Sequence, residues 1–91
     1  MTTKNEIYVK NGWYDETFCK SIESHVCSRI PNMPFNVGHR LKTICGKEFW
    51  NTLTRGEKII AGFFIASLVE ENKLPLRFGR FVSGSRTFYR I

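Results

Sequence analysis

The sequence predicts an α+β domain in which two or three helices pack on a small antiparallel sheet that closes with a C-terminal hairpin. Three observations predict this class. An apolar stripe at helical spacing runs through residues 15 to 29, a capping box opens a long helix at residue 54, and aromatic-rich strands flank a Ser-Gly-Ser turn near the end. The length of 91 residues allows one domain, spanning 1–91.

The first elements are a short strand and a helix. Residues 6 to 10 carry β-branched and aromatic side chains, and the turn dipeptide Asn11-Gly12 follows them. Asp15 can then cap a helix over residues 15 to 29, because its carboxylate accepts the free N–H groups of the first turn. The stripe of that helix repeats every four residues: Phe18, Ile22, Val26 and Ile30. Pro31 ends the helix.

The middle of the chain predicts a loop and short helical turns. Residues 31 to 38 form the loop, in which the alternation of Phe35 and Val37 allows a short strand. One or two helical turns follow over residues 41 to 53, broken at Gly46. The side chains expected to face the core are Leu41, Ile44, Phe49, Trp50 and Leu53.

A long helix is predicted over residues 54 to 71. Thr54 and Glu57 have the spacing of a capping box, and Asn72 and Pro75 mark the end. Its body is apolar on more than one stripe, which is typical of a helix that is packed on several sides or that lies in a subunit interface. A homodimer through helix 54–71 is therefore one expectation.

The tail predicts a hairpin. Its strands are residues 76 to 82 and 86 to 91, joined by Ser83-Gly84-Ser85, and Gly79 marks a bulge. The resulting order of strand, helix, possible strand, short helix, long helix and hairpin favours a winged helix. An unspecific α+β domain is the alternative.

The positive charge is concentrated in this tail. The net charge of the chain is +6; residues 1 to 71 hold nine Lys and Arg against eight Asp and Glu, and residues 72 to 91 hold no acid. The five cations of the tail are Lys73, Arg77, Arg80, Arg86 and Arg90. They are the predicted binding residues, because arginines on a hairpin can contact phosphates.

Two functions of different classes follow from this charge. The first is a nucleic-acid-binding accessory or regulatory module that uses the hairpin. The second is a module that binds an acidic protein partner, as an immunity or antitoxin-type inhibitor does; an ordinary hairpin with solvated arginines is the third interpretation. The body of helix 54–71 holds almost no side chains that read base edges, which argues against a standard recognition helix.

Catalytic and metal chemistry have little support in the sequence. Cys19, Cys27 and Cys45 lie at spacings that match no zinc pattern, and His25 and His39 complete none. We expect reduced thiols, no metal, no cofactor and no enzymatic activity. The start lacks the apolar core of a signal peptide and no run is long enough for a membrane span, so we expect a cytoplasmic protein without a membrane partner.

Over residues 49 to 91 the chain resembles a family of small bacterial domains of unknown function. The shared features are Phe49-Trp50, Leu53, Gly56-Glu57-Lys58, Gly62 and the closing pair Phe88-Tyr89. Members often have Arg after the helix glycine, where this chain has Phe63. The resemblance implies a small bacterial or phage-derived accessory protein, such as a regulator, antitoxin, immunity protein or phage inhibitor. It transfers no functional residue.

Overall fold

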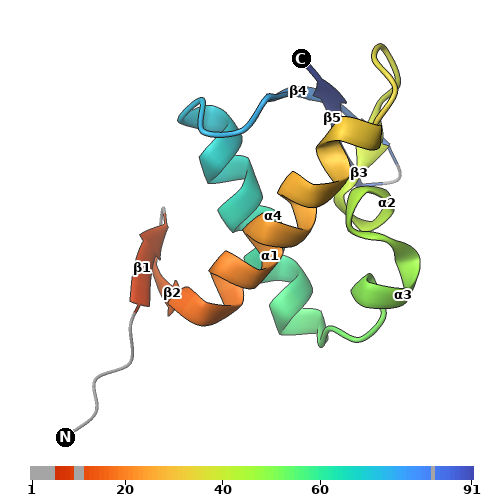
Figure 1. Ribbon diagram of the computed structural model, residues 1–91. Helices are drawn as coiled ribbons and strands as arrows, with labels where there is room; N and C mark the ends of the chain where they lie inside the picture. The colour runs from red at the N-terminus through yellow and green to blue at the C-terminus, as the bar shows by residue number, and fades with distance from the viewer. Residues whose placement is uncertain (1–5, 10–11, 83) are drawn as a thin grey trace, which may run out of the picture.

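The computed structural model describes residues 6–9, 12–82 and 84–91, and it is an α+β domain as predicted (Figure 1). Lys10, Asn11 and Ser83, which belong to the predicted first strand and turns, lie outside the described residues. The elements in chain order are β1 Glu6–Val9, β2 Gly12–Asp15, α1 Glu16–Arg29, the 3-10 turn η1 Ile30–Asn32, β3 His39–Arg40, α2 Leu41–Cys45, α3 Lys47–Trp50, α4 Arg55–Glu70, β4 Leu76–Val82 and β5 Ser85–Arg90.

The N-terminal segment contains a strand that the sequence analysis does not predict. β2 pairs antiparallel with β1, and Gly12, which the sequence analysis places in a turn, is the first residue of β2. β2 is only four residues long and its last residue, Asp15, is already the N-cap of α1, where its carboxylate accepts a bond from the Phe18 N–H at 2.9 Å. The predicted N-cap at Asp15 is therefore confirmed. Because Asp15 belongs to both elements, its capping pattern gives no sign of the strand that precedes the helix.

Both long helices form where their local signals predict. In α4 the Thr54 side chain accepts from the Glu57 N–H while the Glu57 carboxylate accepts from the Thr54 N–H, which completes the capping box. The helix ends at Glu70 with Glu71 as its C-cap, and Asn72 follows with a φ of 60°, in the left-handed region. The N–H groups of Asn72 and Lys73 donate to the carbonyls of Val69 and Leu68, and these bonds form a Schellman motif.

The C-terminal sheet has the order β3-β5-β4 and is antiparallel throughout. The register between β4 and β5 shifts between Phe78 and Phe81, which confirms the bulge at Gly79. A side chain at Gly79 would collide with the Thr87 hydroxyl and the Tyr89 ring, so the close approach of the strands requires glycine there. The predicted strand around Phe35 and Val37 is wrong: Phe35 makes one isolated bridge to Arg90, and the strand β3 forms at residues 39 and 40 instead.

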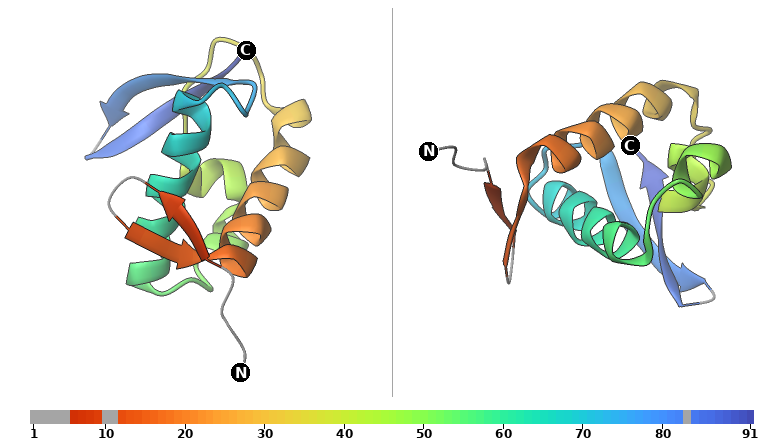
Figure 2. Two further views of the ribbon diagram at one scale, coloured as in Figure 1. Left: turned by 90° about the vertical axis from the view of Figure 1, so that its left-hand side faces the viewer. Right: turned by 90° about the horizontal axis from the view of Figure 1, so that it is seen from below.

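The core lies where α1, α4 and the sheet meet (Figure 2). It is built from Cys19, Ile22 and Val26 of α1, from one face of α4, and from Leu76 and Phe88 of the hairpin, among others. Of the short-helix residues expected in the core, Leu41 and Ile44 are buried, whereas Phe49, Trp50 and Leu53 are half-buried against it. Toward its turn the hairpin extends beyond the helices (Figure 2), and Ile59 and Phe63 of α4 are exposed.

From α1 onward the order is helix, short strand, helices and hairpin, with β5 between the other two strands of its sheet. This is the order on which the winged-helix prediction depends. The α+β class and the C-terminal hairpin are confirmed; the likeness to winged helices stays a prediction.

Candidate nucleic-acid interface

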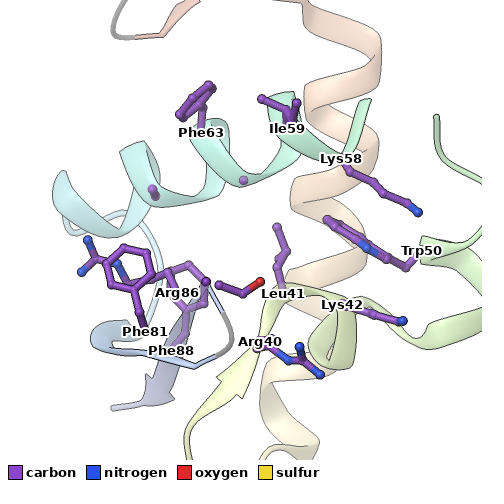
Figure 3. Close-up of a pocket in the computed structure, with 14 residues that line it drawn as sticks. Arg40, Leu41, Lys42, Trp50, Lys58, Ile59, Phe63, Phe81, Arg86 and Phe88 are labelled. Atoms are coloured by element: carbon purple, nitrogen blue, oxygen red, sulfur yellow. The ribbon is translucent and has the colours of Figure 1, made fainter. Parts of the chain in front are cut away.

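A groove of about 570 Å³ separates α4 from the turn end of the hairpin and from α2 (Figure 3). Its walls come from four parts of the chain that are distant in sequence: β3 with α2, Trp50 of α3, the middle of α4, and the β4–β5 turn region. We call this feature the α4 groove. Its volume lies within the usual range of ligand-binding clefts.

The charged side chains of the α4 groove are all cationic within the part of the chain that the structure describes. They are Arg40 from β3, Lys42 from α2, Lys58 from α4 and Arg86 from β5. In Figure 3, Lys42 and Lys58 lie beside Trp50 at one end, and Arg86 lies beside Phe81 at the other. Cations brought together without a carboxylate produce a positive potential inside a concave surface, which attracts anions.

The α4 side of the groove is apolar and partly empty. Ile59, Gly62, Phe63 and Ala66 share one face of the helix at spacings of three and four residues. Ile59 and Phe63 are each 51% exposed. A Cβ atom built at Gly62 meets nothing within 4 Å, so the glycine leaves open space that no other part of the described chain fills.

The hairpin side of the groove carries a stacked arrangement. The guanidinium of Arg86 lies 4.7 Å from the centroid of the Phe78 ring and 4.4 Å from that of Phe81. Phe78 packs on the core through Phe88, at 5.9 Å between ring centroids, whereas Phe81 is 61% exposed. These cation–π contacts hold the charge of Arg86 and the ring of Phe81 in place at the groove edge.

The structure separates the five cations that the sequence predicts as a binding surface. Arg86 alone of the five lines the α4 groove. Arg90 donates to the carbonyls of Pro31 and Met33, at 3.1 and 3.0 Å, and its guanidinium lies 4.3 Å from the centroid of the Phe35 ring. It therefore fastens the 31–35 loop to the sheet.

The remaining three lie elsewhere. Arg77 lies over the Tyr89 ring at 4.3 Å from its centroid, and cross-strand pairing puts both side chains on the sheet face opposite Phe78 and Phe88. Arg80 is exposed beside the bulge, and Lys73 forms an ion pair of 3.2 Å with Glu71 after the end of α4.

Sequence reasoning missed three of the groove cations. The three residues are Arg40, Lys42 and Lys58. They belong to the part of the chain whose net charge is nearly zero, so the distribution of charge along the sequence does not mark them as binding residues. One signal was present: Lys58 lies in the polar first turn of the long helix, next to an apolar run. The position of Arg40 beside the hairpin depends on the pairing of β3 with β5, which no local pattern shows.

No histidine or cysteine of the described chain lines the α4 groove. His25 stacks on Phe49 with ring centroids 3.8 Å apart, and the buried Nε2 of His39 makes no hydrogen bond to the described residues. All three cysteines are free thiols. Burial raises the pKa of Cys45 to about 11 although Arg29 acts in the opposite direction. Residues 6–9, 12–82 and 84–91 hold no cluster of three metal-ligating side chains, and no helix there has the length and hydropathy to cross a membrane.

Comparison with known proteins adds no relative. No protein-family model, no curated protein and no solved structure matches this chain. The resemblance over residues 49 to 91 therefore stays a prediction, and the functional argument rests on the geometry of the groove.

Proposed function

We propose that this chain is a non-enzymatic binding module, accessory or regulatory in role and cytoplasmic, that binds nucleic acid through the α4 groove. The observation that carries the proposal is that four cations from four elements line one concave surface of the described chain that no carboxylate lines: Arg40, Lys42, Lys58 and Arg86. Phosphates are the anions that such a set of separated Lys and Arg side chains suits best.

The position of the groove supports the same function. If the predicted winged-helix likeness holds, the helix before the hairpin and the hairpin itself form the nucleic-acid face, and these are α4 and β4–β5. The groove face of α4 presents Ile59, Gly62, Phe63 and Ala66, which offer no side-chain donors or acceptors to base edges. Binding is therefore expected to depend on the backbone and to be weakly sequence-specific.

A second candidate function has its own observation. Several exposed apolar side chains lie at the groove. Ile59, Phe63 and Phe81 line it, and Val82 follows Phe81 in β4. Apolar surface rimmed by polar groups is typical of protein interfaces. An acidic protein partner, or a second copy of this chain packed on α4, is the alternative occupant that binding experiments distinguish from nucleic acid.

The test is the salt dependence of binding to a fluorescein-labelled oligonucleotide, measured by anisotropy between about 50 and 300 mM salt. If each of the four groove cations contacts one phosphate, the log–log slope is about −2.8 for a single strand and about −3.6 for a duplex. Replacing Arg40, Lys42, Lys58 and Arg86 with Gln is expected to weaken binding at least tenfold and to flatten the slope.

The matched control removes four cations outside the groove: Lys20, Lys47, Lys73 and Arg77, each changed to Gln. It has the same net charge as the groove variant, and we expect it to keep the slope of the unmodified chain. Equal losses in both variants would show that total charge, and not the groove, drives binding. Absence of binding at the lowest salt contradicts the proposal, and capture of an acidic protein by the same surface then favours the alternative.

A further inference from the structure

The geometry points to single-stranded nucleic acid as the ligand of the α4 groove, with bases stacked on Phe81 and Trp50 and phosphates on the surrounding cations. This inference rests on the proposed function and specifies its substrate. Three features of the groove carry it: exposed aromatic surface, open space along α4, and cations on the rim.

The aromatic surface favours unpaired bases. Base–aromatic stacking contributes to binding in proteins that hold single strands, because every base has a π face. Phe81 is 61% exposed, and the Arg86 guanidinium lies over one face of its ring, so the opposite face is the one that a base can stack on. At the other end of the groove Trp50 is half-buried, and it is fixed against the core.

Phe81 and Trp50 both line the α4 groove, whose volume is about 570 Å³. Two small residues of α4, Gly62 and Ala66, line the groove, and a Cβ at Gly62 meets nothing within 4 Å. A helix-interior glycine costs about 1 kcal/mol relative to alanine, and no contact within the described chain requires it. The open space therefore leaves room for close approach of a ligand to α4.

A duplex fits this surface poorly. Its bases are paired and stacked inside, so it offers phosphates to Arg40, Lys42, Lys58 and Arg86 but no base faces to the aromatic rings. Its grooves are read by polar side chains, and the α4 face between the cations has none. If a duplex is placed against Ile59 and Phe63, the polar groups on its surface lose their hydrogen bonds to water. The apolar side chains offer no hydrogen bonds in return, so the contact costs free energy.

The experiment uses Trp50 as its reporter. The chain has two tryptophans, Trp13 and Trp50, so Trp13→Phe leaves one in the groove. This variant is titrated with oligo-dT of about twelve nucleotides and, at the same salt, with a dA·dT duplex of equal length. We expect the single strand to bind at least tenfold more tightly and to quench the Trp50 fluorescence, and the duplex to leave it unquenched.

Two further variants separate stacking from charge. In the Trp13→Phe background, Phe81→Ala removes one aromatic surface, and Gly62→Leu fills the open space beside α4. Each is expected to weaken single-strand binding by about 5- to 150-fold, which is the effect of losing one stacked base. Because neither changes the charge, the salt slope stays the same and weak duplex binding changes less than twofold. Melting curves confirm that both variants fold.

The outcomes separate this inference from the proposed function. Equal or tighter binding of the duplex overturns the single-strand assignment and leaves nucleic-acid binding standing. Loss of salt-dependent binding to both ligands overturns both. Single-strand binding that is unaffected by Phe81→Ala and by Gly62→Leu contradicts the stacking geometry, as does binding without any change in Trp50 emission.

Discussion

The guanidinium of Arg86 lies 4.4 Å from the centroid of the Phe81 ring, and the two residues are partners across the β4–β5 register. This relationship depends on the bulge at Gly79, because the extra residue puts Phe81 on the same sheet face as Arg86 and Phe88. A cation and an exposed aromatic ring are thereby held together at the edge of the α4 groove. The other arginines of the hairpin have different roles, and the difference can be measured.

Arg90 is expected to stabilise the fold more than Arg77 does. Arg90→Ala removes the bonds to the carbonyls of Pro31 and Met33, and bonds from a charged donor contribute about 1.5–3 kcal/mol each. We expect a loss of at least about 1.5 kcal/mol in the free energy of unfolding by urea. Arg77→Ala loses one exposed cation–π contact, about 1 kcal/mol or less. Equal losses would show that Arg90 does not fasten the loop.

Neighbouring phenylalanines of α4 are expected to differ strongly. Phe64 is 4% exposed in the core, and Phe63 is 51% exposed on the groove face. Phe64→Ala therefore costs about 3–5 kcal/mol, which is a large share of the stability of so short a domain. Phe63→Ala leaves the melting temperature nearly unchanged. Thermal unfolding followed by circular dichroism gives both values, and the reverse order would mean that α4 is rotated about its axis.

Two glycines are expected to respond to alanine with opposite signs. Gly62 lies inside α4 with open space around its Cβ position, so Gly62→Ala should raise the free energy of unfolding by up to about 1 kcal/mol. Gly46 joins α2 to α3 with a φ of +95°, a conformation that is strained for alanine. Gly46→Ala is therefore expected to destabilise the chain in urea. A stabilising Gly46→Ala would contradict the break between the two short helices.

The three thiols are expected to react at very different rates. Cys27 is exposed, whereas Cys19 and Cys45 are buried in the core. Burial raises the pKa of all three thiols, and that of Cys45 to about 11, so accessibility and not the pKa sets Cys27 apart. With a disulfide reagent at pH 8, one thiol per chain should react quickly and the others only in urea, because the reagent reaches only the exposed sulfur in the native chain. Fast reaction of all three in the native chain would contradict the core described above.

The elements with strong local signals were predictable. Asp15, Thr54 and Asn72 set helix ends through their own hydrogen bonds or backbone conformation, and these signals are visible in a few residues of sequence. Strand β2 was missed because the helix cap occupies its last position. The strand at 39 and 40 was misplaced because its only partner, β5, is almost fifty residues away.

The candidate site was predictable only in part. The excess of positive charge in the tail pointed to the hairpin as the binding surface, and Arg86 of the hairpin does line the groove. The number of charges, however, does not show on which face of the hairpin each side chain lies. Arg90 was predicted to bind a ligand from its charge alone. Its hydrogen-bond partner Pro31 is 59 residues away in sequence, so no local pattern indicates that Arg90 holds the loop. Lys42 and Lys58 became groove residues through tertiary packing that places α2 opposite α4. Local patterns therefore predicted the elements, and the site emerged from their packing.

The most direct test of the central claim maps the contact surface itself. Backbone amide chemical shifts of the isotope-labelled chain are recorded at low salt with increasing oligo-dT. The account predicts that the largest changes fall in three segments that meet at the α4 groove, residues 40–42, 58–66 and 84–86, with small changes along the exposed face of α1. Changes concentrated on α1 or around Arg77 and Tyr89, or no changes at all, would contradict the assignment of the α4 groove as the nucleic-acid interface.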